Sequence, residues 1–252
     1  MTTRIEEIAE RIYCISSFVP QIPPRGFAFN QVLVDADEPL LFHCGMRSLF
    51  EAVRGAVARV LPPERLRWVS FSHVEADECG AMNAWLAIAP HATVLHGEVG
   101  CAVSVNDLAD RPPRALADGA VQDLGGRAVR LLATPQVPHN WEAIVLFEER
   151  TRTLFAGDLL TSAGDDRILT RDDVSERVLD LARASGAYSL APDTRATYER
   201  LAALQPAVAA SMHGPGVAAD AAGVLRRIGA GLEALAAAAP PDRSRQPPPS
   251  AR

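Results

Sequence analysis

The most regular feature of the sequence is a series of short runs of β-branched, aromatic and aliphatic residues separated by polar turns. In one pair, Phe27–Val34 and Leu40–His43 flank a turn rich in Asp and Pro, a pattern typical of a β-hairpin. Gly125-Gly126 separates a second pair, and Glu148–Arg152 separates a third. The predicted strands are residues 11–16, 27–34, 40–43, 66–71, 93–96, 121–124, 128–132, 143–147, 153–156 and 207–211.

Helical periodicity marks other segments. Apolar residues recur three or four positions apart in residues 48–60, and this run stops before Pro62. Asp77 and Glu78 suit the first turn of a helix that Pro90 ends. The predicted helices are residues 48–60, 77–89, 174–184, 194–204 and 217–238.

The order of these elements indicates the fold class. Strands dominate the first two thirds of the chain as hairpins, with helices between them and after them. This pattern favours an α/β (α+β) domain in which two mostly antiparallel sheets are covered by helices. Because no linker-like stretch and no repeat interrupts residues 1–238, we expect them to form one domain. Residues 239–252 are rich in Pro and Arg and are expected to be a disordered tail.

Composition narrows the class of protein. A net charge of -6 gives little support to a nucleic-acid or anionic-membrane partner. The four cysteines show no CxxC spacing, which argues against a zinc knuckle or a disulfide framework. The first ten residues lack an apolar signal-peptide core, and no run reaches the roughly 18 apolar residues of a membrane span. We therefore expect a cytoplasmic protein.

Histidines and carboxylates gather directly after a predicted buried strand. His73, Glu75 and Asp77 alternate in the sequence SHVEADE. Because alternate side chains of an extended backbone point the same way, all three can converge on one spot. Imidazole and carboxylate groups are both common metal ligands.

Three further candidate ligands follow later strands. His139 lies in a loop after the strand at residues 128–132, Asp158 follows the strand at 153–156, and His213 follows the strand at 207–211. Taken singly, each has an ordinary explanation as a loop, turn or helix-start residue. Together they form a set at strand ends, where a sheet scaffold presents functional loops, and the set predicts a metal site.

The segments SHVEADE, PHNW, AGDLL and SMHGPG, in this order, resemble the metal-binding motifs of the metallo-β-lactamase fold. They resemble most closely its diiron branch, the flavodiiron and oxygen-binding diiron proteins. Hydrolases of this fold carry HxHxDH as their first motif, whereas the diiron branch has a glutamate at the second histidine, the position of Glu75 here. The resemblance covers residues 10 to 235 and implies a four-layer αββα sandwich.

The resemblance also implies a distribution of ligands. His73, Glu75 and His139 would bind one iron, Asp77 and His213 would bind the other, and Asp158 would bridge both. The chemistry of the residues agrees, because three imidazoles with three carboxylates form a harder, more oxygen-rich set than structural zinc sites use.

Three departures from the family pattern leave questions open. Glu78 stands where the family usually has a histidine after the aspartate, and it could be a seventh ligand, a hydrogen-bond acceptor behind the ligands, or a helix-start charge. His43 replaces an aspartate that usually supports the ligands. No flavodoxin-like segment follows, so we expect no FMN in this chain. Apart from these departures, His96 is either a pocket residue or a buried structural histidine.

The resemblance implies a pair of iron ions that binds O2, with NO as an alternative ligand. Two Fe(II) ions can supply two electrons, whereas reduction of O2 to water needs four. Turnover would therefore need an external donor such as a small flavoprotein or a rubredoxin-like protein. The diiron relatives tend to be homodimers, which this chain could share.

Two alternatives remain at this stage. The same fold could support a zinc- or manganese-dependent hydrolase of an ester, thioester or phosphodiester, in which the metals activate a hydroxide. The second alternative is an oxygen or redox sensor without catalysis.

Overall fold

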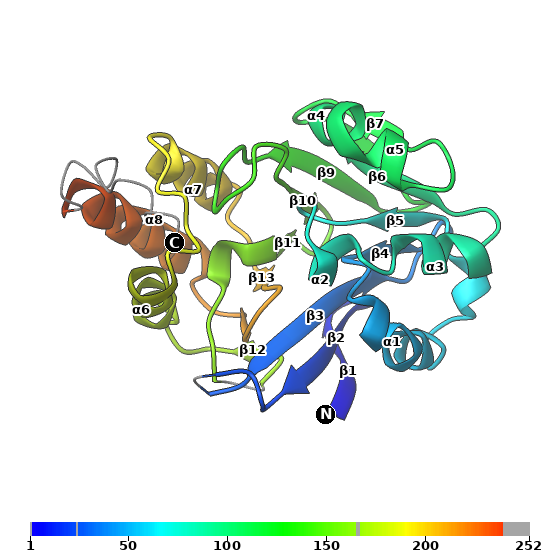
Figure 1. The fold of residues 1–252 in the computed structure, drawn as a ribbon, viewed down its shortest axis with the longest axis horizontal. Coiled ribbons are helices and arrows are strands. Elements are labelled where there is room, and N and C mark those ends of the chain that lie inside the picture. The colour runs from blue at the N-terminus through cyan, green and yellow to red at the C-terminus, as the bar shows by residue number, and fades with distance from the viewer. Residues whose placement is uncertain (1, 24, 165–166, 239–252) are drawn as a thin grey trace, which may run out of the picture.

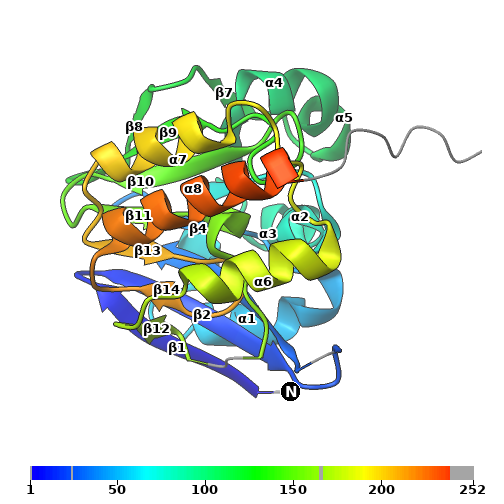
Figure 2. The ribbon, with the colours of Figure 1, turned by 90° about the vertical axis from the view of Figure 1, so that its left-hand side faces the viewer.

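The computed structural model describes residues 2–23, 25–164 and 167–238, which form two seven-stranded sheets (Figures 1 and 2). The first sheet contains, in spatial order, β1 (Thr2–Ala9), β2 (Ile12–Val19), β3 (Phe27–Val34), β4 (Leu40–Phe42), β5 (Trp68–Ser70), β6 (Thr93–Gly97) and β7 (Arg114–Leu116). The second contains β12 (Leu169–Thr170), β14 (Gly216–Val217), β13 (Val208–Ala210), β11 (Thr153–Phe155), β10 (Ile144–Glu148), β9 (Ala128–Ala133) and β8 (Val121–Asp123).

Helices cover the outer face of each sheet, so that the architecture has four layers in the order αββα (Figure 1). The first sheet packs against α1 (Phe50–Val57) and α3 (Met82–Ile88), beside the short α2 (Ala76–Cys79). The second packs against α6 (Ser175–Ser185), α7 (Thr194–Ala203) and α8 (Ala221–Ala238). The predicted four-layer sandwich is confirmed.

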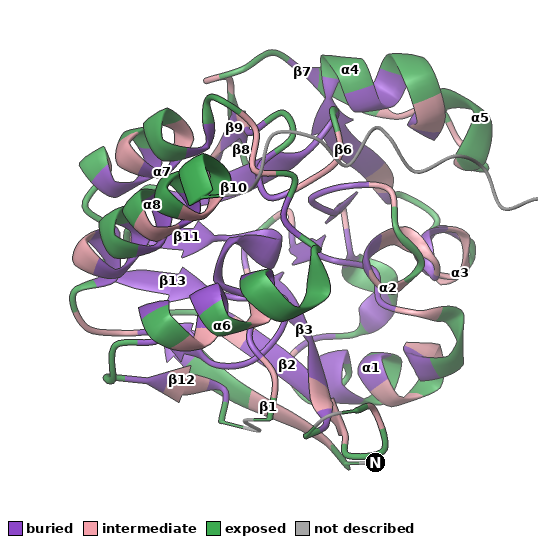
Figure 3. Cartoon of the chain, turned by 60° about the vertical axis from the view of Figure 1, so that its left-hand side comes forward, coloured by how far each residue is buried: buried purple, intermediate pink, exposed green. Residues whose placement is uncertain are grey.

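Both faces of the central strands are buried, which explains their nearly continuous apolar sequences (Figure 3). In β4, Phe42 faces the second sheet while Leu41 faces the helices. In β10, Leu146 faces the first sheet while Phe147 faces the helices. Three apolar layers therefore hold the four structural layers together.

The connections decide the strand directions. Hairpins join β1 to β4, and these strands pair antiparallel. From β4 to β7 the strands pair parallel, because a helical segment lies between each strand and the next. The first sheet is therefore mixed, and the expectation of mostly antiparallel sheets is wrong for its strands β4 to β7.

Several predicted boundaries differ from the structure. The helix predicted at residues 77–89 is divided into α2 and α3. The last helix begins at Ala221 rather than at residue 217, because Gly216–Val217 pairs with two neighbouring strands as β14. The element predictions missed β1, β7, β12, β14 and the helical segment of α4 (Glu98–Gly100), η3 (Cys101–Val105) and α5 (Asn106–Leu108). The predicted tail lies outside the described residues.

Among residues 2–23, 25–164 and 167–238, no helix combines the length and the apolar character needed to cross a membrane.

The layer between the two sheets should carry much of the stability. We expect Leu146→Ala, which removes a fully buried side chain from this layer, to lower the free energy of unfolding by about 2–5 kcal/mol. Leu108→Ala is the matched control, because Leu108 is 44% exposed, and it should cost about 0.5 kcal/mol or less. Urea unfolding of both variants measures the difference, and equal losses would contradict this account of the core.

Candidate metal centre

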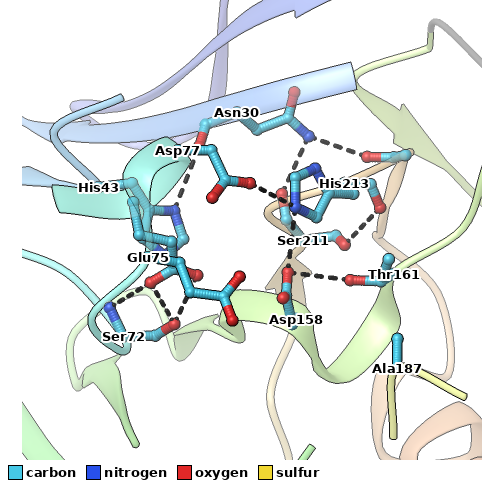
Figure 4. Close-up of polar contacts among 12 residues, drawn as sticks. Asn30, His43, Ser72, Glu75, Asp77, Asp158, Thr161, Ala187, Ser211 and His213 are labelled. Carbon is cyan, nitrogen blue, oxygen red and sulfur yellow. Dashed lines mark hydrogen bonds and ion pairs between the residues drawn. The ribbon is translucent and has the colours of Figure 1, made fainter. Parts of the chain in front are cut away.

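The structure brings the six candidate residues together between the ends of the two sheets, and Figure 4 shows Glu75, Asp77, Asp158 and His213 among them. His73 and Glu75 follow β5, and Asp77 lies in the first turn of α2. On the opposite side, His139 follows β9, Asp158 lies in the 3-10 turn η4 (Gly157–Leu160), and His213 follows β13. Each sheet therefore contributes candidate ligands from the ends of its strands.

The backbone conformation that directs the side chains of SHVEADE differs from the predicted one. Glu75 lies beside His73, whereas Asp77 lies beside His213 in another part of the cluster, and the backbone is not an extended strand. The Glu75 N–H donates to the His73 carbonyl at 3.1 Å, and the chain then enters α2. A tight turn followed by a helix, rather than strand alternation, therefore directs these side chains.

One part of the site combines two imidazoles and a carboxylate. The Nε2 atoms of His73 and His139 lie 2.9 Å apart. Glu75 places one carboxylate oxygen 3.6 Å from His73 Nε2 and the other 3.5 Å from His139 Nε2. Asp158 Oδ2 lies 3.8 Å from His73 Nε2 and 3.5 Å from His139 Nε2. These four residues can direct their donor atoms at a single ion.

The other part contains one imidazole. His213 Nε2 lies 3.2 Å from Asp77 Oδ2 and 3.3 Å from Asp158 Oδ1 (Figure 4). The two oxygens of Asp158 therefore face different parts of the site, Oδ2 toward His73 and His139 and Oδ1 toward His213. Thr161 Oγ1 also donates to Asp158 Oδ1 at 3.0 Å, which holds the carboxylate in this orientation.

Backbone carbonyls fix the tautomers of two of the candidate histidines. A carbonyl can only accept, so His139 Nδ1 donates to Ala187 O at 2.7 Å and His213 Nδ1 donates to Ala28 O at 2.7 Å. In the neutral form, each ring then carries its lone pair on Nε2, the atom that faces the cluster. A second partner on the distal nitrogen is typical of histidines that bind metals.

Ser72 fixes the third ring. Its hydroxyl donates to the Glu78 carboxylate at 2.6 Å, so its oxygen accepts from His73 Nδ1 at 2.9 Å. With Nδ1 protonated, neutral His73 and His139 would point two lone pairs at each other across 2.9 Å. Such an arrangement requires a proton or a metal cation between the rings.

The electrostatics of the site favour positive charge. Burial alone lowers the pKa of His73, but the carboxylates of Glu78, Glu75 and Asp158 outweigh it and raise the pKa to about 10. Burial likewise opposes the charge on His213, yet Asp158 and Asp77 raise its pKa. Without a cation, the acidic groups hold protons on these rings. A divalent metal would compete with those protons for the same nitrogen atoms.

Glu78 lies behind the ligands with both carboxylate oxygens occupied. It accepts hydrogen bonds from the Ser72 N–H at 2.8 Å, the His73 N–H at 2.9 Å and the Ser72 hydroxyl. Burial by itself raises the pKa of this carboxyl, but His43, His73 and these hydrogen bonds lower it. Of the three roles open to Glu78, this geometry supports the hydrogen-bond acceptor.

The two other unassigned histidines are packed away from the cluster. His43 donates from Nδ1 to Asn30 O at 3.2 Å, and its Nε2 lies 3.6 Å from Glu78 Oε1. His96 is fully buried with its ring centroid 4.7 Å from that of Phe71, and burial lowers its pKa to about 4. Gly100 leaves room for the His96 ring, because a Cβ there would lie 2.2 Å from Nδ1.

Several residues that support the site escaped the sequence analysis. Asn30 donates from Nδ2 to Ser211 O and Gly214 O, each at 2.9 Å, and so fixes the His213 loop against β3 (Figure 4). Tyr188 donates to Asp158 O at 3.1 Å, and Tyr198 donates to Leu159 O at 2.8 Å. A polar amide within the apolar strand FAFNQVLV was the one available signal, whereas nothing local marked the tyrosines.

Gly157 shows why the η4 turn needs a glycine. Its φ is +50°, and a Cβ at this position would lie 2.8 Å from the Ser72 hydroxyl oxygen. The turn that carries Asp158 can therefore approach the turn that carries His73.

Comparisons with known proteins give a family match over most of the chain. A family model described as ODP family beta lactamase matches residues 27–214, a range that includes all six candidate ligands. No curated protein matches the sequence.

Solved structures show the same fold. Rubredoxin oxygen:oxidoreductase from Desulfovibrio gigas is 17% identical over 93% of this chain and 62% of its own, with a TM-score of 0.80. A metal-soaked flavodiiron core from Synechocystis is 22% identical over 91% of this chain and 60% of its own, with a TM-score of 0.77. A fragment described as a diflavin flavoprotein from Nostoc is 16% identical, covers 92% of this chain and 96% of its own, and has a TM-score of 0.79. The chain thus spans about three fifths of the first two proteins.

The buried position of Glu78 predicts a large stability effect. We expect Glu78→Ala to lower the free energy of unfolding of the metal-free protein by about 3–5 kcal/mol, because the buried N–H groups of Ser72 and His73 lose their acceptor and the His73 ring loses a neighbouring carboxylate. Glu51→Ala is the control, because the Glu51 side chain is 73% exposed and pairs with Arg54 only one turn away. Urea unfolding with a chelator present measures both, and a small effect of Glu78→Ala would contradict its role as an acceptor.

Proposed function

Because the chain belongs to the ODP family of beta lactamases, we propose that its cluster holds two iron ions and binds O2, or alternatively NO, with electrons from an external donor. The observation that carries this proposal is the position of Glu75 between the rings of His73 and His139. Two imidazoles with one carboxylate are the ligand set typical of non-haem Fe(II) sites with open coordination positions.

We assign His73, Glu75 and His139 to one ion, Asp77 and His213 to the other, and Asp158 to both. The split orientation of the Asp158 oxygens supports this assignment. Charge supports it as well, because the ionised carboxylates of Glu75, Asp77, Asp158 and Glu78 would balance two divalent cations. All donor atoms are nitrogen or oxygen, which suits iron better than a thiolate-rich zinc site.

When bound, two ferrous ions supply two electrons and coordination positions for a diatomic ligand. The protein contributes fixed tautomers through Ala28, Ser72 and Ala187, so that each Nε2 is available as a ligand. It also leaves an open side, because the side chain of Glu75 is 45% exposed and that of His139 is 20% exposed. A gaseous ligand and an electron donor can both approach from this side.

The electron donor follows from electron counting. Reduction of O2 to water needs four electrons, two more than a ferrous pair holds, so catalytic turnover requires a donor. The name of the Desulfovibrio gigas relative couples rubredoxin to O2. We therefore propose a rubredoxin-like protein or a small flavoprotein as the donor for this chain. Without a donor, the site would bind O2 once per reduction.

Anaerobic reconstitution with Fe(II), followed by exposure to O2, tests the proposal. We expect two iron ions per chain by metal analysis, a Mössbauer signal from both, and an absorption change on adding O2. His139→Ala should lower the iron content and abolish the absorption change, whereas His91→Ala should change neither because His91 is exposed outside the cluster. Stoichiometric zinc in the native protein, no response to O2, and zinc-dependent ester or phosphodiester hydrolysis would instead indicate a hydrolase.

Metal removal should destabilise the fold. An ion present at about one hundred times its dissociation constant stabilises the native state by about 2.7 kcal/mol. For a chain of this length we therefore expect a chelator to lower Tm by about 5–10 °C. Differential scanning calorimetry with and without chelator measures this shift. Asp158→Asn should show a smaller chelator-dependent shift, and an equal shift in the variant would contradict the assignment of Asp158 to both ions.

A further inference from the structure

The donor atoms are divided unequally between the two parts of the site. One part contains His73, His139 and Glu75, with Asp158 Oδ2 within 3.8 Å of both ring nitrogens. The other contains only His213 and Asp77, with Asp158 Oδ1. We call these the four-donor half and the three-donor half. An additional imidazole distinguishes the four-donor half chemically as well as numerically.

The two halves also differ in how closely their donor atoms are gathered. Among the described residues, two groups of three residues place donor atoms within 4.8 Å of one another. They are His73 with Glu75 and His139, and His73 with Glu78 and Asp158. The first group lies entirely in the four-donor half, whereas the second includes Glu78, which lies on the Nδ1 side of His73 and belongs to neither half. Neither group contains Asp77 or His213. The four-donor half is therefore the more compact one before any ion binds.

Glu78 does not make up the difference. Its two oxygens accept from two backbone N–H groups and a hydroxyl, and Oε1 lies 3.4 Å from Nδ1 of His73, the ring atom opposite Nε2. A turn of this carboxylate toward an ion would leave buried donors at Ser72 and His73 without an acceptor. The three-donor half therefore keeps three protein donors.

We propose that the site fills in a fixed order, with the first ion in the four-donor half and the second in the three-donor half only at higher metal concentration. Two physical effects separate the steps: the second ion has fewer protein donors, and it enters next to a divalent charge that already shares Asp158. The two-ion form that the proposed function requires is then set by the free metal concentration. This inference rests on the cluster being a dinuclear metal site.

Metal titration of the full chain, stripped with a chelator, tests the order. We use Fe(II) under anaerobic conditions with equilibrium dialysis, and Zn(II) with calorimetry. Two binding steps are expected, with dissociation constants that differ by at least about tenfold. A single step with two equivalent ions would overturn the proposal.

Variants assign the steps to the halves. Asp77→Asn should retain the tight step and lose the weak one, whereas His139→Ala should weaken the tight step by at least about tenfold. Asp107→Asn, at an exposed residue of α5, is the matched control and should leave both steps unchanged. Loss of both steps in Asp77→Asn, or an unchanged tight step in His139→Ala, would overturn the proposed order. Circular dichroism and thermal melting of each metal-free variant verify that it is folded.

Glu78→Gln tests the role of Glu78 separately. As a residue that positions His73, Glu78 acts on the tight step, so Glu78→Gln should weaken that step by about ten- to a hundredfold and leave the weak step in place. Loss of the weak step in the folded variant would make Glu78 a ligand of the second ion and overturn the proposal.

The two probes distinguish this inference from the proposed function. Two unequal Zn(II) binding steps in a protein that shows no iron or O2 chemistry would contradict the proposed function but support the proposed filling order. A diiron protein that responds to O2 but binds both ions in one step would keep the function and remove the filling order.

Discussion

The site depends on one constraint, that each of the three clustered imidazoles has its Nδ1 atom committed to an acceptor outside the cluster. Ala28 and Ala187 supply carbonyls for His213 and His139, and Ser72 supplies its hydroxyl oxygen for His73. Because these acceptors belong to β3, to the connection after α6 and to the end of β5, the ring orientations require the assembled fold. The geometry of the donors is therefore a property of both sheets together rather than of any single motif.

Glu78 is a buried carboxylate beside one of these rings, His73, and it must also find its hydrogen-bond partners within the fold. A carboxylate that takes no part in the cluster is costly to bury unless it is fully hydrogen-bonded. Glu78 meets this condition by closing the turn that carries His73 and by contacting His43 from behind. His43 and Glu78, which both depart from the family pattern, therefore support the His73 turn as a pair. His43 Nε2 lies 3.6 Å from Glu78 Oε1.

The sequence pattern predicted the candidate ligands of the site but not the residues that hold them in position. His73, Glu75, Asp77, His139, Asp158 and His213 stand next to strand ends, and strand ends are visible in the hydrophobic pattern. Asn30, Tyr188 and Tyr198 act through contacts with segments distant in the sequence, so no local pattern reveals them.

The fold shows the same contrast between elements that have a local sequence pattern and elements that do not. Strongly apolar strands such as Phe27–Val34 were predicted with the correct boundaries. The charged edge strand β1 was missed, because it pairs with β2 but buries only one of its own side chains and so lacks an apolar pattern. The two-residue strands β12 and β14 were missed because a strand that short has no periodicity of its own.

The hydrogen bonds around residues 187 and 188 give the connection between α6 and α7 a second role. Ala187 accepts from His139, and Tyr188 donates to the carbonyl of Asp158, so this connection contacts two candidate ligands from outside the cluster. Local opening of the connection would free both contacts at once. An ion held by His139 and Asp158 would therefore slow hydrogen exchange and protease cleavage at this connection. Hydrogen exchange or protease cleavage at this connection would then report whether metal is bound, although the connection lies outside the cluster.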